Sequence, residues 1–118
     1  MGIDDYRLDV VFFRTSSGAE PVRKWLKSLS SPEKKRIGED IKTVQFGWPL
    51  GMPLVEKLEP YLWEVRTTMP DGIARVLFTV DGAIMVLLHG FIKKTRKIPR
   101  KDLDTARTRL QQYVEAGR

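Results

Sequence analysis

The pair Asp81-Gly82, between two long apolar segments, constrains the fold of this chain more than any other feature. A two-residue hairpin turn needs positive φ angles, which glycine adopts without a steric cost. The flanking segments, residues 73–80 and 83–91, are rich in β-branched and aromatic side chains. The sequence therefore predicts an antiparallel hairpin with Val80 opposite Ala83.

Two more strands are expected around this hairpin. Residues 61–67 carry tyrosine, tryptophan and valine at alternate positions and lead into the turn-forming segment 68–72. We expect Tyr61 and Trp63 to pack in the core, with base stacking as the alternative. Residues 6–13 also alternate with a period of two, and they form the predicted first strand.

Three helices are expected from the spacing of apolar residues. The first follows Ser17 and Glu20, which are spaced as a capping box. The second begins at Ser31-Pro32 and stops at Gly47, and the third covers residues 99–114. Apolar positions recur at intervals of three and four residues: Val22, Trp25, Leu26 and Leu29 in the first helix, and Ile37, Ile41 and Val44 in the second.

The resulting order of elements is β-α-α-β-β-β-α, which predicts an α+β fold. A largely antiparallel sheet is expected to pack against a helical hairpin, with the last helix on an edge or face of the sheet. Residues 48–53 form a connecting loop, because two prolines and a glycine interrupt any helix or central strand there. With no linker or repeat, residues 1–118 form one predicted domain.

Composition excludes several classes of function. The chain has no cysteine and one histidine, so thiolate nucleophiles and Cys-ligated or His-rich metal sites are excluded, and we expect no cofactor. P-loop and dinucleotide-binding glycine motifs are also missing from the sequence. No apolar run approaches the ~18 residues of a membrane span, and the acidic N-terminus is unlike a secretory signal, so we expect a cytoplasmic protein.

Positive charge is concentrated near the C-terminal end. The chain carries 21 Lys and Arg against 15 Asp and Glu, a net charge of +6. Residues 93–101, named here the basic segment, contain Lys93, Lys94, Arg96, Lys97, Arg100 and Lys101. Such a segment suits phosphate backbones, acidic partners or anionic membranes, and a solvated basic loop is the alternative.

Two arginines interrupt otherwise apolar strands near the turn at residues 68–72. Arg66 and Arg75 each offer a guanidinium that binds phosphate bidentately and stays charged near neutral pH. Both project from one face if residue 66 pairs with residue 75, whereas a shift of one residue separates them. The alternative is that Glu64 or a nearby carboxylate pairs with one of them, or that they face water.

Histidine is the side chain best suited to proton transfer near pH 7, and His89 is the single one in the chain. It is therefore a candidate general acid–base, with a structural role as the alternative. Counting from the Asp81-Gly82 turn places Arg75 opposite Leu88 and His89 opposite Ala74. His89 then projects from the face opposite to Arg75 unless a bulge intervenes.

Lysines near the strand ends are candidates to bind phosphates or to stabilise negative charge in a transition state. Lys57 precedes the strand predicted at residues 61–67. Lys93 and Lys94 follow the strand predicted at residues 83–91. The alternative is that all three are ordinary surface lysines.

Four successive segments resemble the phage-derived HigB-type toxins of the RelE superfamily: Pro53-Leu-Val-Glu-Lys-Leu58, Leu62-Trp-Glu-Val-Arg66, Ile73-Ala-Arg-Val-Leu-Phe78 and Leu87-Leu-His-Gly-Phe-Ile-Lys-Lys-Thr95. The similarity covers roughly residues 53–114 and implies a RelE-like fold. It also implies a toxin of a type II toxin–antitoxin system. Such toxins are metal-independent endoribonucleases that cut mRNA, commonly in the ribosomal A site.

The resemblance also suggests roles for individual residues. Arg66 and Arg75 match arginines that bind the scissile phosphate, and Lys57 stands where related toxins carry a basic residue. The expected catalytic residues are Arg66, Arg75, His89 and Lys93, and the expected RNA-binding residues are Lys57, Lys94, Arg96 and Lys97. Ile98 departs from the family, which often has Ser or Thr there, so we expect the last helix to lack its N-cap.

The partners implied by the resemblance are mRNA, the ribosome and a helix-turn-helix antitoxin of the HigA type. Two other functions remain open. One is a non-catalytic RNA- or ribosome-binding module that uses the same cations. The other is a phage-derived regulator that acts by protein–protein contact through the basic segment.

Overall fold

The computed structural model describes residues 7–117. In chain order the elements are β1 (Asp9–Phe12), α1 (Pro21–Lys27), α2 (Ser31–Gly47), β2 (Val55–Glu59), β3 (Leu62–Met69), β4 (Gly72–Asp81), β5 (Ile84–Lys93) and α3 (Arg100–Glu115). The predicted α+β class and order of elements are confirmed, with the short strand β2 added. Tyr6, the predicted start of the first strand, and the acidic N-terminus lie outside the described residues.

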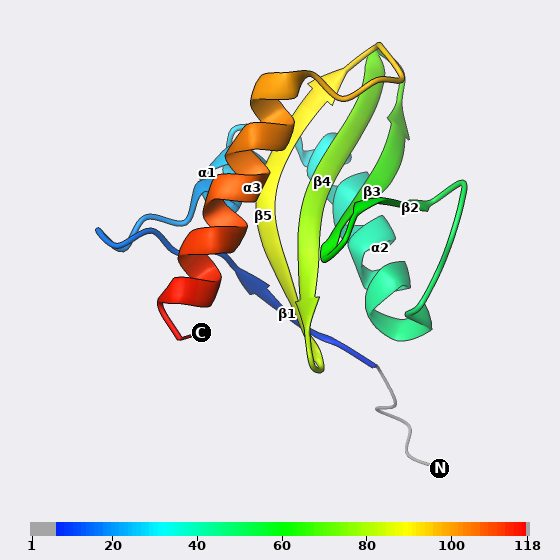
Figure 1. The fold of residues 1–118 in the computed structure, drawn as a ribbon. Coiled ribbons are helices and arrows are strands. Elements are labelled where there is room, and N and C mark those ends of the chain that lie inside the picture. Colours follow the sequence, from blue (N-terminus) through cyan, green and yellow to red (C-terminus); the bar gives the residue numbers. More distant parts are fainter. Residues whose placement is uncertain (1–6, 118) are drawn as a thin grey trace.

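The five strands form one sheet in the order β1-β5-β4-β3-β2. β1 runs parallel to β5, and the other neighbours are antiparallel. The helices α1 and α2 cover one face of the sheet, and α3 crosses the other (Figure 1). The largely antiparallel sheet is thus confirmed, and the last helix lies on a face.

Each face of the sheet has its own hydrophobic cluster. The apolar stripes predicted for the first two helices pack with the inner side chains of β3, β4 and β5. On the other face, Leu103, Ala106 and Leu110 of α3 pack against Leu77 and Leu88 of the sheet. Burial of these stripes holds the three helices to the sheet.

The strand β2 was not predicted, because its sequence Val-Glu-Lys-Leu-Glu is short and mostly charged. It pairs with β3 through a tight turn in which Tyr61 has a φ of 67°. The prediction of a packed Tyr61 is wrong, since this side chain is 71% exposed in the turn. Core packing is confirmed for Trp63, which stacks on Phe78 and meets Trp48 edge to face.

The turn of the β4–β5 hairpin lies one residue later than predicted. Asp81 pairs with Ile84, so Gly82 and Ala83 form the turn and Val80 lies opposite Met85. Gly82 takes the positive φ of 60° at the first turn position, where glycine is preferred.

Helix capping differs from the prediction at two helices. At α1 the N-cap is Glu20, whose side chain makes no capping hydrogen bond, so the predicted box with Ser17 is wrong. At α2 a capping box forms between Ser30 and Glu33, one residue before the predicted start. The expected lack of a side-chain cap at α3 is confirmed, with Pro99 as N-cap.

None of the helices found within residues 7–117 combines the length and the apolar character that crossing a membrane requires.

Candidate functional site

The pairing of β3 with β4 places the two strand arginines side by side. Arg66 lies opposite Arg75 in the antiparallel register, so both side chains project from the face that α3 partly covers. Of the two registers considered from the sequence, the structure therefore has the one that places Arg66 and Arg75 on the same face.

A bulge in the β4–β5 ladder brings His89 to the same face. The register shifts between Leu77 and Phe78, so Leu77 lies opposite His89 and Arg75 opposite Phe91. The predicted pairings of Arg75 with Leu88 and of His89 with Ala74 are therefore wrong. A shift of one residue reverses the side-chain alternation of β5 beyond the bulge, which sequence counting from the turn does not anticipate.

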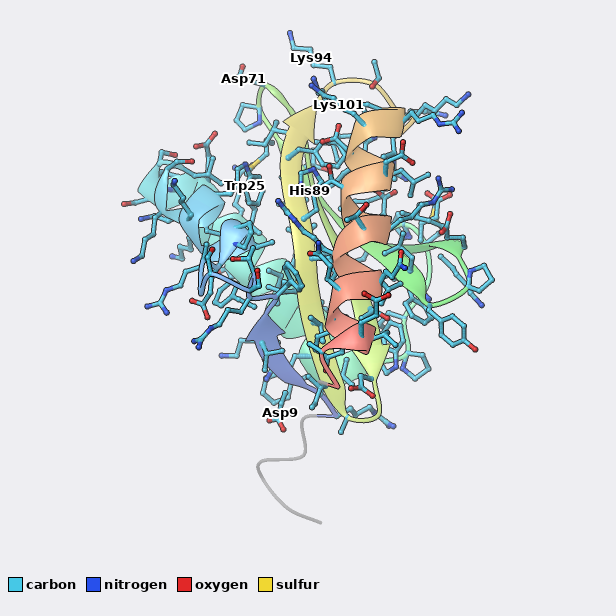
Figure 2. All side chains as sticks on the ribbon, turned by 60° about the vertical axis from the view of Figure 1, so that its left-hand side comes forward. Asp9, Trp25, Asp71, His89, Lys94 and Lys101 are labelled. Atoms are coloured by element: carbon cyan, nitrogen blue, oxygen red, sulfur yellow. The ribbon has the colours of Figure 1, made fainter. Side chains whose placement is uncertain are left out.

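His89 lies between β5 and α3 (Figure 2), and both of its ring nitrogens are engaged. Its Nε2 is 2.7 Å from Oδ1 of Asp102, and its Nδ1 is 3.3 Å from Nη1 of Arg109. A guanidinium only donates hydrogen bonds, so Nδ1 accepts and Nε2–H donates to the carboxylate. This histidine ties α3 to the sheet, and the arrangement offers no ring nitrogen to a substrate.

Arg75 is fully buried, with a relative exposure of 0%. Its Nη2 donates to the backbone carbonyls of Thr95 and Arg96 in the basic segment. Its Nε lies 3.4 Å from Oε1 of Glu64, and its guanidinium lies 6.0 Å from the ring centroid of Phe91. The buried guanidinium of Arg75 is therefore surrounded by groups of the protein itself: two carbonyls, a carboxylate and an aromatic ring.

Arg66 remains accessible, with 18% of its side chain exposed. Its Nη1 is 3.5 Å from Oε1 of Glu56, and its Nε is 3.6 Å from Oε2 of Glu64. Glu64 is buried, and loss of solvation raises its pKa to about 7, an effect that the charges of Arg75 and Arg66 partly oppose. Two carboxylates and two guanidiniums thus share this part of the face.

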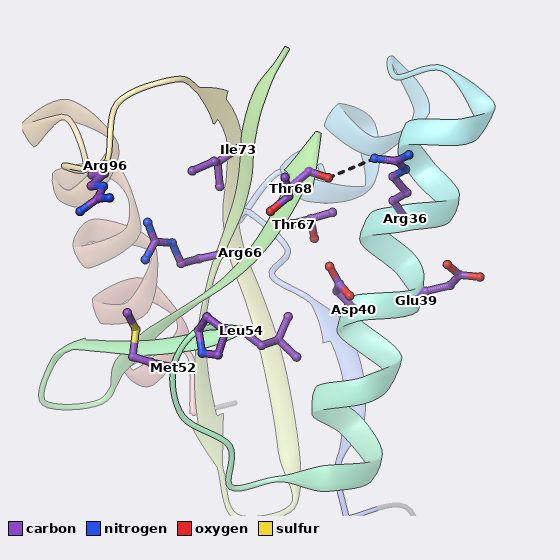
Figure 3. Close-up of a pocket in the computed structure, with 11 residues that line it drawn as sticks. Arg36, Glu39, Asp40, Met52, Leu54, Arg66, Thr67, Thr68, Ile73 and Arg96 are labelled. Atoms are coloured by element: carbon purple, nitrogen blue, oxygen red, sulfur yellow. Dashed lines mark hydrogen bonds between the residues drawn. The ribbon is translucent and has the colours of Figure 1, made fainter. Parts of the chain in front are cut away.

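An open groove of about 750 Å³ lies beside Arg66 at the free edge of β3 (Figure 3). The ladder with β2 ends at Val65, and one more backbone hydrogen bond, from the N–H of Arg66 to the carbonyl of Leu54, closes it, so β2 leaves the edge of β3 unpaired beyond Arg66. The groove is lined by Arg36, Glu39, Asp40, Met52, Pro53, Leu54, Arg66, Thr67, Thr68, Ile73 and Arg96. The groove wraps around the edge of β3, with Arg66 and Arg96 on the side of the sheet that carries α3 and Arg36 and Asp40 on the side of α2.

The predicted lysines are distributed differently. Lys57 projects from the opposite face of the sheet, where its Nζ lies 5.8 Å from the ring centroid of Trp63. Lys93 shares the face of Arg66 and Arg75 through its pairing with Ile73. The residues Lys93, Lys94 and Lys97 are exposed and do not line the groove, whereas Arg96 does.

Sequence reasoning did not identify Arg36 or Glu56 as part of the site. Arg36 lies on the exposed side of α2, and its Nη1 donates to the carbonyl of Thr68 over 3.3 Å. Glu56 belongs to the strand that was not predicted. Neither residue has a sequence signal, because both join the site through contacts with β3. Within the part of the chain that the structure describes, no three acidic or histidine side chains gather as a metal site requires.

Comparison with known proteins assigns the sequence to a family. Residues 24–111 match the model of a family described as phage-derived protein Gp49-like (DUF891). No curated protein matches the chain significantly. The matched region begins in α1, ends in α3, and contains the groove and both strand arginines. Because it covers well over half of the sequence, the chain belongs to the family of Gp49-like phage-derived proteins.

Proposed function

We propose that this protein is the toxin of a type II toxin–antitoxin pair and that it cleaves mRNA without a metal ion. The observation that carries the proposal is that Arg36, Arg66 and Arg96, from three different elements, line one open groove around the edge of β3. Guanidiniums match phosphate oxygens in charge and geometry, and three of them suit a polyanionic strand better than a single small anion. Membership of a phage-derived family and the HigB-like motifs support the same assignment.

In the proposed reaction the ribose 2′-oxygen attacks the adjacent phosphorus while the bond from phosphorus to the 5′-oxygen breaks. The products are a 2′,3′-cyclic phosphate and a 5′-hydroxyl. Arg66 stabilises the charge that develops on the phosphoryl oxygens, since it is the strand arginine that reaches the groove.

The reaction also moves two protons. Glu56 is assigned to accept the proton of the 2′-hydroxyl, because its carboxylate is 43% exposed and lies 3.5 Å from Arg66. The leaving 5′-oxygen is assigned a proton from water in the open groove, and Lys93, on the same face at the end of β5 but outside the groove, is assigned to bind a neighbouring phosphate. His89 has no step in this proposal, because both of its nitrogens are engaged beneath α3.

The proposed partners are mRNA on the ribosome and a HigA-type helix-turn-helix antitoxin. The exposed lysines of the basic segment continue the positive charge beyond the groove, where ribosomal RNA presents further phosphates. An antitoxin that covers the groove would block access to Arg66.

The test is primer extension on a reporter mRNA in a purified translation system, with and without ribosomes. We expect cuts with the wild type and a rate roughly 100-fold lower with Arg66→Ala, as for loss of a transition-state charge contact. Arg23→Ala removes an exposed arginine of α1 outside the groove and should cleave normally. Absence of cuts by the wild type in both conditions would contradict the nuclease proposal.

A non-catalytic RNA-binding module is the second candidate, and the engagement of the single histidine favours it. In that case translation stops while the mRNA stays intact. Product analysis in the same experiment therefore separates the two candidates.

A further inference from the structure

The basic segment is held to the sheet by a buried guanidinium. Nη2 of Arg75 donates to two successive carbonyls, those of Thr95 and Arg96, the latter over 2.8 Å. Another hydrogen bond of this segment, from Oγ1 of Thr95 to the carbonyl of Lys97, is internal to it. The position of the backbone at Arg96 therefore depends on Arg75.

The same guanidinium is linked to Arg66 in two ways. Arg75 lies directly opposite Arg66 in the β3–β4 ladder. The carboxylate of Glu64 joins their side chains, with one oxygen 3.4 Å from Arg75 and the other 3.6 Å from Arg66. Glu64 is only 1% exposed, so its contacts with the two guanidiniums are shielded from water. The strength of such buried ion pairs depends strongly on their geometry.

We propose that Arg75 is a positioning residue, which sets Arg66 and Arg96 at their separation across the groove without touching the RNA. The inference rests on the proposed function of the groove and assigns Arg75 a role different from phosphate binding. Arg66 and Arg96 come from elements distant in sequence, so their separation depends on a tertiary contact between these elements. Arg75 contacts the backbone that carries Arg96 and the carboxylate that orients Arg66.

The first test uses Arg75→Lys, which keeps the charge. Arg75 uses Nη2 for the two carbonyls and Nε for Glu64, and a lysine has one nitrogen that cannot occupy both places, so the segment should loosen. We expect trypsin to cut the basic segment faster than in the wild type, because the segment is rich in Lys and Arg. RNA cleavage should fall by roughly 100-fold, as expected for displaced catalytic groups.

A double-mutant cycle separates positioning from direct contact. If Arg75 acts through Arg96, Arg75→Lys should cost a much smaller factor in the Arg96→Ala background than in the wild type. In the Arg23→Ala background the full loss should persist. Equal trypsin rates for wild type and Arg75→Lys, or the same fold loss in all backgrounds, would overturn the inference.

A measurement on the wild type covers the case in which Arg75→Lys does not fold. Arginine side-chain NMR is recorded with and without a 2′-O-methyl RNA oligonucleotide, which lacks the attacking hydroxyl and stays intact. The Nε–H signals of Arg66 and Arg96 should shift on binding more than that of Arg75. A largest shift at Arg75 would show direct contact and overturn the inference.

Failure of the proposed function can be distinguished from failure of this inference. If the proposed function is wrong, the wild type leaves RNA intact, and the trypsin comparison still decides whether Arg75 holds the basic segment.

Discussion

Glu64 lies between the guanidiniums of Arg66 and Arg75 and is shielded from water. The guanidiniums and the lack of solvent have opposite effects on the ionisation of its carboxyl group. Burial favours the neutral acid, whereas Arg75 and Arg66 favour the carboxylate. Burial is the larger effect, so the pKa is raised from 4.5 to about 7. The protonation of this single side chain therefore changes over a pH range near neutrality.

This residue should make stability depend on pH in a defined direction. Between pH 4.5 and about 7 the folded protein binds more protons at Glu64 than the unfolded chain does. Its contribution to the free energy of unfolding is therefore full below pH 4.5 and is lost as the pH rises through 7. Urea unfolding of the wild type and Glu64→Gln at pH 5 and pH 8 measures this.

The wild type should lose stability relative to Glu64→Gln between these two pH values, because glutamine does not titrate. A constant difference between the two proteins would show that Glu64 has an ordinary pKa.

At the scale of elements, α1 packs against Gly90 of β5 through the ring of Trp25. A Cβ at this position would lie 2.4 Å from ring carbons of Trp25. Trp25 packs against the core from α1, so its ring has little room to move away.

Gly90→Ala should therefore destabilise the protein by about 1–3 kcal/mol, the usual cost of overpacking a core. Gly38→Ala is the matched control, because no atom lies within 4 Å of its Cβ and it stands inside α2. There the replacement should stabilise by about 0.5–1 kcal/mol through helix propensity. Chemical denaturation measures both; equal effects of the two substitutions would contradict the packing argument.

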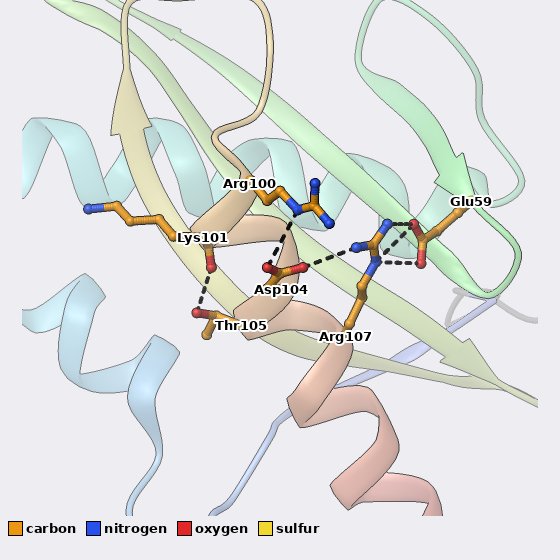
Figure 4. A network of polar contacts seen from close by, with 6 residues as sticks. All are labelled: Glu59, Arg100, Lys101, Asp104, Thr105 and Arg107. Carbon is orange, nitrogen blue, oxygen red and sulfur yellow. Dashed lines mark hydrogen bonds and ion pairs between the residues drawn. The ribbon is translucent and has the colours of Figure 1, made fainter.

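The attachment of α3 combines buried and exposed contacts. Arg107 makes a bidentate ion pair with Glu59 of β2 and also bonds Asp104, at the solvent-facing side of the helix (Figure 4). The apolar residues and the His89–Asp102 contact lie on the side facing the sheet. Because exposed ion pairs contribute little, the buried side holds the helix and the exposed pairs mainly orient it.

At the scale of the whole molecule, the net charge of +6 predicts that the proposed binding to RNA is sensitive to salt. Each phosphate neutralised on a single strand contributes about 0.7 to the slope of log affinity against log salt concentration. Three groove arginines thus predict a slope of at least roughly −2 for the 2′-O-methyl oligonucleotide.

Arg36→Ala should reduce the magnitude of that slope by about 0.7, and Arg23→Ala should leave it unchanged. Fluorescence anisotropy titrations between low and physiological salt give these slopes. A flat dependence for the wild type would favour a regulator that docks on a protein through its basic segment.

The sequence alone determined the α+β class, the order of the main elements and the positions of the two longer helices. These follow from local periodicity and from glycine and proline, which act over a few residues. It also identified Arg66 and the basic segment, since a cation in an otherwise apolar strand and a cluster of cations are both visible without a structure.

Only the tertiary structure decided which candidates meet. The bulge at Leu88 brought His89 to the face of Arg75, and the docking of α3 then engaged both nitrogens of that histidine. The basic segment closes over the sheet and buries Arg75, whereas β2 begins only at Val55, opposite Val65, and so leaves the side chain of Arg66 beside an open groove. Strand register, side-chain burial and the shape of the groove arise from contacts between residues distant in sequence. The local sequence pattern of a single element cannot predict such contacts.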